Sequence, residues 1–142
     1  MRFWDSSAIV PLLLEQPQSA AVNELIGEDD EMVVWWSSPI ECASAVARLR
    51  REGCLAIESE STVLALLREL AGTWYEIRPS EELRDTTLRL LRTHSMRAAD
   101  ALQLAAALAW AGTPRGEVIV TFDDRLGTAA QLEGLTVVPR AS

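Results

Sequence analysis

Short apolar runs typical of β-strands alternate with helical patterns along this chain, and their order constrains the fold more than any other feature. The runs predict strands at residues 2–5, 32–36, 74–77, 117–122 and 135–138. The helical patterns lie at residues 6–14, 17–27, 39–52, 58–71, 81–93, 97–111 and 124–131. Strands separated by helices in this way favour a parallel sheet that is covered by helices on both faces. We therefore expect an α/β fold of three layers with a mostly parallel central sheet, and a single domain over residues 1–142.

Acidic side chains occur where binding sites form in such folds, just beyond the carboxyl ends of the strands. Asp5 follows the first predicted strand, Glu41 stands five residues past the second, and Asp123 follows residues 118–122. Each acid also has a simpler explanation. Asp5 and Asp123 would cap the helices that they precede, and Glu41 would complete a capping box with Ser38 at the N-cap.

A fourth acid, Asp100, lies inside a helical run in which nearly every neighbour is small or apolar. Burial of an unpaired carboxylate is costly, so this side chain needs a partner or a function. Two structural explanations stay open. Asp100 could face solvent in the first helical turn, where the helix dipole stabilises an acid, or it could form an ion pair with Arg97, three residues earlier.

Taken together, the four acids point to a metal site. Four carboxylates that meet at one edge of a sheet cannot all stay ionised without a cation, because each charge raises the pKa of the others. Oxygen ligands suit Mg²⁺ or Mn²⁺ rather than Zn²⁺. One or two such ions at a carboxylate cluster activate water for phosphodiester hydrolysis. The sequence therefore predicts a site for one or two ions formed by these acids: Asp5, Glu41, Asp100 and Asp123.

Composition excludes several other classes of protein. Thirteen basic residues against 21 acids give a formal net charge of −8, which excludes a polybasic nucleic-acid binder. All the basic residues are Arg, so no mechanism can use a Schiff-base or Walker lysine. The two cysteines, Cys42 and Cys54, are too few for a disulfide scaffold and favour a cytoplasmic location. The apolar stretch at residues 101–111 is too short to cross a membrane.

Four segments resemble the motifs of the PIN-domain family. Asp5-Ser6-Ser7-Ala8 resembles the opening D-[ST]-S-A motif, and residues 38–45 resemble the second motif, with a Glu near a helix start. Residues 97–105 resemble R-x-x-D-A-L-x-L-A, and residues 121–134 resemble T-x-D-x-x-L-x-x-A-A. The motifs keep the family's order over nearly the whole chain. Within the family, the length and motifs resemble VapC-type toxins of prokaryotic toxin–antitoxin pairs. Two positions depart from the pattern: Gln103 stands where His is frequent, and Asp124 adds an acid.

The resemblance implies a PIN-like fold and an Mg²⁺- or Mn²⁺-dependent endoribonuclease. It gives Asp5, Asp100 and Asp123 as metal ligands, while Glu41 would complete the cluster or orient the attacking water. It also implies an RNA substrate such as tRNA or another structured RNA, a VapB-type antitoxin as partner, and a homodimer. The alternative is a catalytically weak PIN-like module that binds RNA or a protein without cleavage.

Further candidates surround the acids. Ser7 and Arg97 are expected to bind substrate, although Ser7 could be a plain N-cap and Arg97 a surface charge. Asp124 could assist Asp123 or simply open its helix. Arg48 and Arg125 could contact phosphate, but a solvated surface role is favoured. The five tryptophans are expected mostly in the core, and the only histidine, His94, in a loop or cap.

Overall fold

The computed structural model describes residues 1–140 and has a five-stranded sheet at its centre. The strands are β1 (Arg2–Trp4), β2 (Met32–Trp35), β3 (Tyr75–Ile77), β4 (Val118–Val120) and β5 (Thr136–Val138). All neighbouring strands are parallel, and their order across the sheet is β3-β2-β1-β4-β5. The predicted α/β fold with a parallel sheet is therefore confirmed.

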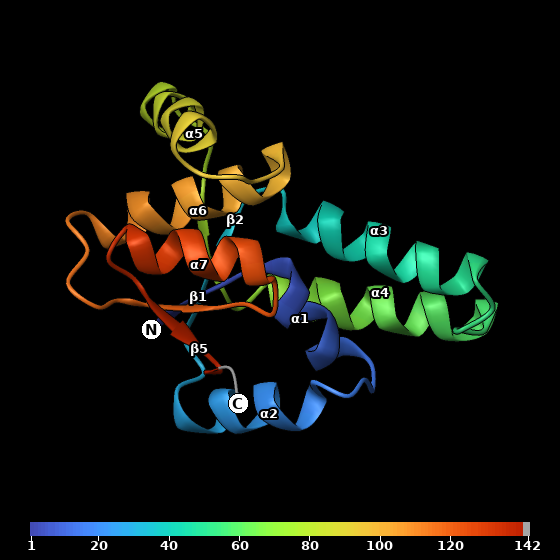
Figure 1. Ribbon diagram of the computed structural model, residues 1–142. Helices are drawn as coiled ribbons and strands as arrows, with labels where there is room; N and C mark the ends of the chain where they lie inside the picture. The colour runs from blue at the N-terminus through green and yellow to red at the C-terminus, as the bar shows by residue number, and fades with distance from the viewer. Residues whose placement is uncertain (141–142) are drawn as a thin grey trace.

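The helices cover the two faces of the sheet (Figure 1). They are α1 (Ser6–Leu13), α2 (Ser19–Glu28), α3 (Ser38–Arg51), α4 (Ile57–Ala71), α5 (Glu81–Thr93), α6 (Ala98–Ala111) and α7 (Asp124–Leu132). Side chains of α5, α6 and α7 bury Phe3 on one face, and those of α1 to α4 bury Trp4 on the other. Because successive strand residues point to opposite faces, the sheet fills two cores and gives the expected three layers.

The strand order places the carboxyl ends of β1 and β4 side by side. The central strand β1 pairs with β2 through Phe3 and Val33, and with β4 through Trp4 and Val120. The backbone N–H of Asp5 donates to the carbonyl of Val120 at 3.0 Å. The chain leaves β1 and β4 in helices on opposite faces, so this edge is the switch point at which such sheets form binding sites.

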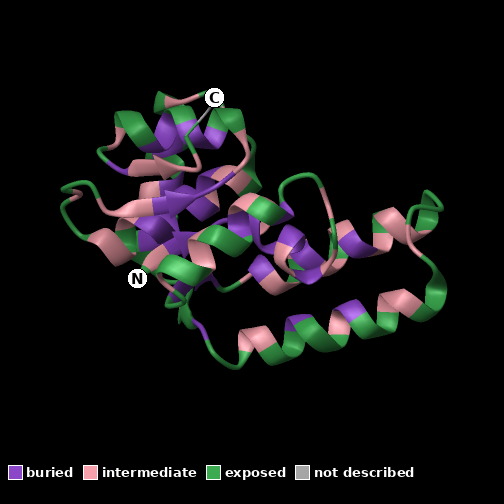
Figure 2. Ribbon diagram, turned by 90° about the horizontal axis from the view of Figure 1, so that it is seen from below, coloured by how far each residue is buried: buried purple, intermediate pink, exposed green. Residues whose placement is uncertain are grey.

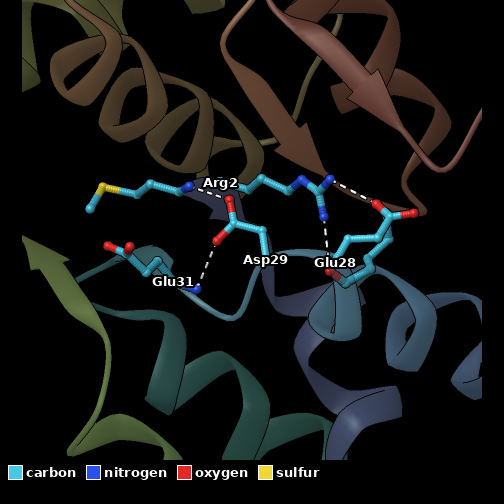
Figure 3. A network of polar contacts seen from close by, with 6 residues as sticks. Arg2, Glu28, Asp29 and Glu31 are labelled. Carbon is cyan, nitrogen blue, oxygen red and sulfur yellow. Dashed lines mark hydrogen bonds and ion pairs between the residues drawn. The ribbon is translucent and has the colours of Figure 1, made fainter.

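Charged contacts hold the start of β1 against the turn between α2 and β2 (Figure 3). The α-amino group of Met1 forms an ion pair with Asp29, and Arg2 donates to Glu28 Oε2 at 2.9 Å. Asp29 Oδ1 also accepts from the backbone N–H of Glu31 at 3.0 Å. The bond from the amino group lowers the pKa of Asp29. These contacts fix the start of β1, the strand that Asp5 follows.

Helix α3 begins one residue earlier than the sequence suggests. Ser37 rather than Ser38 is its N-cap residue, and neither a capping box nor a side-chain cap forms there. The predicted capping box with Ser38 is therefore wrong, because the Ser38 hydroxyl is buried and accepts a bond from Gln103 at 3.0 Å instead. Helix α2 begins at Ser19, two residues after Pro17, and the Ser19 hydroxyl donates to the carbonyl of Pro11 at 2.7 Å.

Buried residues lie between the sheet and the helices on each of its faces. Figure 2 shows buried residues along the sheet and the helices against it, whereas the far ends of α3 and α4 are mostly exposed. Trp4, Trp35 and Trp74 are buried as expected, but Trp36 lies in the turn after β2 and is 44% exposed. Both cysteines are free. Over residues 1–140, no helix combines the length and apolar character needed to cross a bilayer.

Candidate active site

Asp5 stands at the centre of the switch point, between the end of β1 and the start of α1. It is the N-cap residue of α1 and is only 4% exposed. Its Oδ2 accepts bonds from the Ser7 hydroxyl at 2.6 Å and the Thr121 hydroxyl at 2.9 Å. Burial raises the pKa of Asp5, these bonds oppose the shift, and the charge of Asp123 adds to it. The expected cap therefore forms, and the carboxylate still lines an open cavity.

Two hydroxyl groups connect the loops that follow β1 and β4. Ser7 Oγ accepts from the backbone N–H of Phe122 at 3.0 Å, in addition to its donation to Asp5. Thr121 Oγ1 accepts from the backbone N–H of Asp123 at 3.0 Å. We did not predict Thr121 as a site residue from the sequence, although the Thr of the T-x-D segment indicated this position. These bonds set the relative positions of Asp5 and Asp123.

Asp123 and Asp124 open the last helix. Asp123 is the N-cap residue of α7, and its Oδ1 accepts from the backbone N–H of Leu126 at 2.8 Å. Its predicted cap is therefore confirmed. Asp124 lies in the first turn and is exposed. Both side chains line the same cavity as Asp5.

Asp100 reaches this cavity from the first turn of α6 and is half-buried. Burial raises its pKa, and the charges of Asp123 and Asp5 raise it further, while Arg97 opposes the shift. Among the ion pairs within residues 1–140, none joins Arg97 to Asp100. The ion pair with Arg97 that the sequence allowed does not form among these residues, although the nearby charge of Arg97 acts to lower the pKa of Asp100.

Glu41 approaches from α3 and is held by three hydrogen bonds. Its Oε1 accepts from Ser6 Oγ at 3.2 Å, and its Oε2 accepts from Ser37 Oγ and Gln103 Nε2, both at 3.0 Å. Burial raises the pKa of Glu41, the bond from Ser37 opposes the shift, and the charge of Asp5 raises it again. The carboxylate is therefore held by side chains of α1, of the start of α3 and of α6, beside the cavity that the other acids line.

The cavity that these residues share has a volume of about 1210 Å³. Its charged lining residues include Asp5, Glu41, Asp100, Asp123, Asp124, Arg48, Arg97 and Arg125. The fold thus brings the predicted acids to one cavity. Within residues 1–140, however, no three or more His, Cys, Asp or Glu side chains stand close enough to form a metal-binding group. The donors themselves suit a hard divalent cation, because all are carboxylate oxygens and their negative charges raise one another's pKa.

Three arginines line this cavity, whereas the histidine lies outside it. Arg97 is the N-cap residue of α6, and Arg48 and Arg125 are exposed on α3 and α7. His94 ends α5 and its Nε2 lies 2.7 Å from Glu133 Oε2, outside the cavity. The expected cap or loop role of His94 is confirmed.

Comparison with known proteins agrees with this geometry. Residues 2–132 match the family model described as "PIN domain". Two relatives from Mycobacterium tuberculosis, ribonuclease VapC45 and ribonuclease VapC49, are each 32% identical over 140 residues. These alignments cover 96% of this chain and 94% of each relative.

Solved structures share the fold at lower identity. The sarcin–ricin loop cleaving toxin VapC20 of Mycobacterium tuberculosis is 13% identical, with a TM-score of 0.68 over 91% of this chain and 95% of its own. FitAcB from Neisseria gonorrhoeae is 18% identical, with a TM-score of 0.68 over 96% of both chains. The sheet order, the acidic cavity and these matches together show that the chain belongs to the PIN-domain family and, within it, to the VapC type.

Proposed function

We propose that this protein is an Mg²⁺- or Mn²⁺-dependent endoribonuclease that acts as the toxin of a toxin–antitoxin pair. One observation carries the proposal. Four carboxylates from separate elements line a single cavity at the switch point, and burial together with neighbouring negative charge raises the pKa of Asp5, Glu41 and Asp100. Because like charges raise one another's pKa, a cation bound among these carboxylates would relieve their repulsion. The ribonuclease names of the 32% identical relatives support the same activity.

The acids have distinct roles in this proposal. Asp5, Asp100 and Asp123 hold one or two cations, Glu41 completes the cluster or orients the attacking water, and Asp124 is an accessory. When bound there, a divalent cation would supply a water of lowered pKa and stabilisation of charge on the leaving oxygen. Asp5 is well placed to keep its direction, because its Oδ2 accepts bonds from two hydroxyl groups. Rigid support of this kind is what a hydrolytic site requires.

The substrate is bound by groups around the acids. Arg97 lies exposed at the start of α6, three residues before Asp100, and we assign it to an RNA phosphate. A guanidinium suits this contact because it can bind phosphate through two N–H groups. Ser7, which lines the same cavity, is also assigned to the substrate; its hydroxyl donates to Asp5 and accepts from the backbone N–H of Phe122. The RNA would be tRNA or another structured RNA.

The proposed partner, assembly and location are those that the family resemblance implies. We propose that residues 1–142 form one PIN domain, which acts in the cytoplasm as a homodimer and is inhibited by a VapB-type antitoxin. One of the structural neighbours is a toxin–antitoxin complex from Klebsiella pneumoniae, 12% identical with a TM-score of 0.67 over 96% of both chains. That complex supports an antitoxin partner for this fold.

The test separates cleavage from binding. Purified protein is incubated with labelled single-stranded RNA and with tRNA in Mn²⁺, in Mg²⁺ and in EDTA, and RNA binding is followed in parallel by fluorescence anisotropy. We expect cleavage in either metal and none in EDTA. RNA binding without cleavage in both metals would overturn the proposal in favour of a binding module, a reading consistent with the spread positions of the carboxylates.

A further inference from the structure

We infer that Gln103 is a positioning residue that fixes the Glu41 carboxylate for the reaction, an inference that rests on the proposed function. Gln103 is fully buried on α6, one turn after Asp100. The other buried residues of this helix are all alanine or leucine: Ala101, Leu104, Ala105, Ala106 and Ala107. A single amide in such an apolar surface must serve a contact that an apolar side chain cannot make.

The hydrogen bonds of Gln103 show which contact this is. Its Nε2 donates to Glu41 Oε2 and to Ser38 Oγ, both at 3.0 Å. The reverse orientation of the amide would place Oε1 against the Glu41 carboxylate, and two acceptors repel each other. Within residues 1–140, Gln103 Oε1 is buried and has no hydrogen-bond partner. The amide is therefore held for its two N–H groups, at the expense of an unpaired oxygen.

Gln103 differs from the other groups that hold Glu41. Ser6 and Ser37 are half-buried, and a hydroxyl group can rotate away from a carboxylate toward water. Gln103 is fully buried on the apolar face of α6, so its N–H groups can point only where the packing of that helix directs them. The direction of the Glu41 carboxylate is thus set by α6, the helix that also carries Asp100.

This arrangement predicts an effect on turnover rather than on folding. Groups that hold a ligand or a catalytic carboxylate in place change metal affinity or activity by about 10- to 100-fold when they are removed. Gln103 does not line the cavity, so it should not contact RNA. Its loss should therefore lower kcat and weaken Mn²⁺ binding with little change in KM for RNA.

The experiment combines Gln103→Met with Glu41→Ala. Four proteins are compared: wild type, each single variant and the double variant. For each, kcat and KM are measured on a labelled RNA in Mn²⁺, and the Mn²⁺ concentration that gives half of the rise in unfolding temperature is measured without RNA. Leu104→Met is the control for repacking of the buried face of α6. Ser38→Ala removes the other acceptor of the Gln103 amide while leaving its bond to Glu41.

We expect Q103M to lower kcat at least 10-fold, to leave KM within about 3-fold, and to have no further effect in the E41A background. S38A and L104M should keep kcat within about 3-fold of wild type. The inference is overturned if Q103M keeps its kcat, or if the loss of kcat in Q103M is repeated in full in the E41A background. It is also overturned if S38A loses as much kcat as Q103M, because Gln103 would then act by linking α3 to α6.

The Mn²⁺ measurement separates this inference from the proposed function. If the wild-type protein cleaves no RNA, the proposed function fails, and Gln103 is then judged by metal binding alone. A Mn²⁺ midpoint raised about 10-fold in Q103M, and not raised further when E41A is added, supports the positioning role. An unchanged midpoint, or a wild-type protein that shows no Mn²⁺-dependent shift, overturns it.

Discussion

The hydroxyl group of Thr121 donates to Asp5 Oδ2 at 2.9 Å and joins the ends of two central strands that are 116 residues apart in the sequence. The same oxygen of Thr121 accepts from the backbone N–H of Asp123 at 3.0 Å. One buried side chain therefore sets the separation of two acids from different elements. In this protein, the loop after β4 is positioned by the loop after β1.

Replacing Thr121 with Val should destabilise the protein and reduce RNA cleavage. The change keeps the shape of the side chain but leaves the N–H of Asp123 without its acceptor and Asp5 without one donor. A loss of this kind costs about 1 to 3 kcal/mol of unfolding free energy. Urea denaturation of T121V and of the exposed control Thr128→Val measures the difference. Equal stability of the two variants would contradict the role assigned to Thr121.

The metal-free protein should lose an Asp5-dependent part of its stability as the pH rises. The folded pKa of Asp5 is raised above 3.8, chiefly by burial, so the folded state binds more protons than the unfolded state between these two values. Stability from this group is present at pH below 3.8 and falls as the pH rises through the folded pKa.

Asp5→Asn isolates this contribution, because an amide oxygen can accept the same bonds and Asn is an equally good N-cap residue. In EDTA, the unfolding free energy of D5N relative to wild type should increase between pH 4 and pH 7, as measured by denaturation at each pH. A difference that is constant or decreases with pH would show that burial does not penalise the Asp5 charge.

Mn²⁺ should raise the unfolding temperature of the wild-type protein. A ligand that binds only the folded state stabilises it by about 2.7 kcal/mol when its concentration is 100 times its Kd. Asp100→Asn should reduce the shift, whereas the exposed control Asp85→Asn on α5 should keep it. Differential scanning fluorimetry with and without millimolar Mn²⁺ provides the measurement. Equal shifts in D100N and D85N would exclude Asp100 from the cation site.

The two cysteines should differ sharply in reactivity. Cys42 is fully buried beside the acids, and burial, with the charges of Glu41 and Asp5, raises its pKa to about 12. Cys54 is exposed. A thiol reagent at pH 8 should therefore modify one thiol quickly in the folded protein and two in denaturant. Two fast equivalents under native conditions would contradict the burial of Cys42.

The sequence predicts local features of this fold better than distant ones. The cap at Asp123 was expected and forms, because Asp123 Oδ1 accepts from the backbone N–H of Leu126, three residues away. The capping box at Ser38 was expected and does not form, because Gln103, 65 residues later, takes the Ser38 hydroxyl. Local spacing specifies a helix end only where no distant side chain competes for the same group.

The candidate site, like the helix ends, could be predicted only in its local features. The alternation of strands and helices was enough to expect acids at one edge of a parallel sheet. It could not show that β1 lies between β2 and β4, which is what brings Asp5 beside Asp123. Nor could it show that Gln103, 62 residues later in the chain, holds the Glu41 carboxylate, because that contact depends on where α3 and α6 meet.

RNA cleavage by carboxylate variants is the most direct test of the account. Wild type, D5N, D100N and the control D85N are assayed at equal concentration on one labelled RNA in Mn²⁺, after each is shown to be folded. The acidic cavity predicts that D5N and D100N lose at least 100-fold in cleavage rate, a loss of about 2.7 kcal/mol in transition-state stabilisation, while D85N matches wild type. Wild-type cleavage rates in D5N and D100N would show that the acids at the end of β1 and the start of α6 do not form the active site.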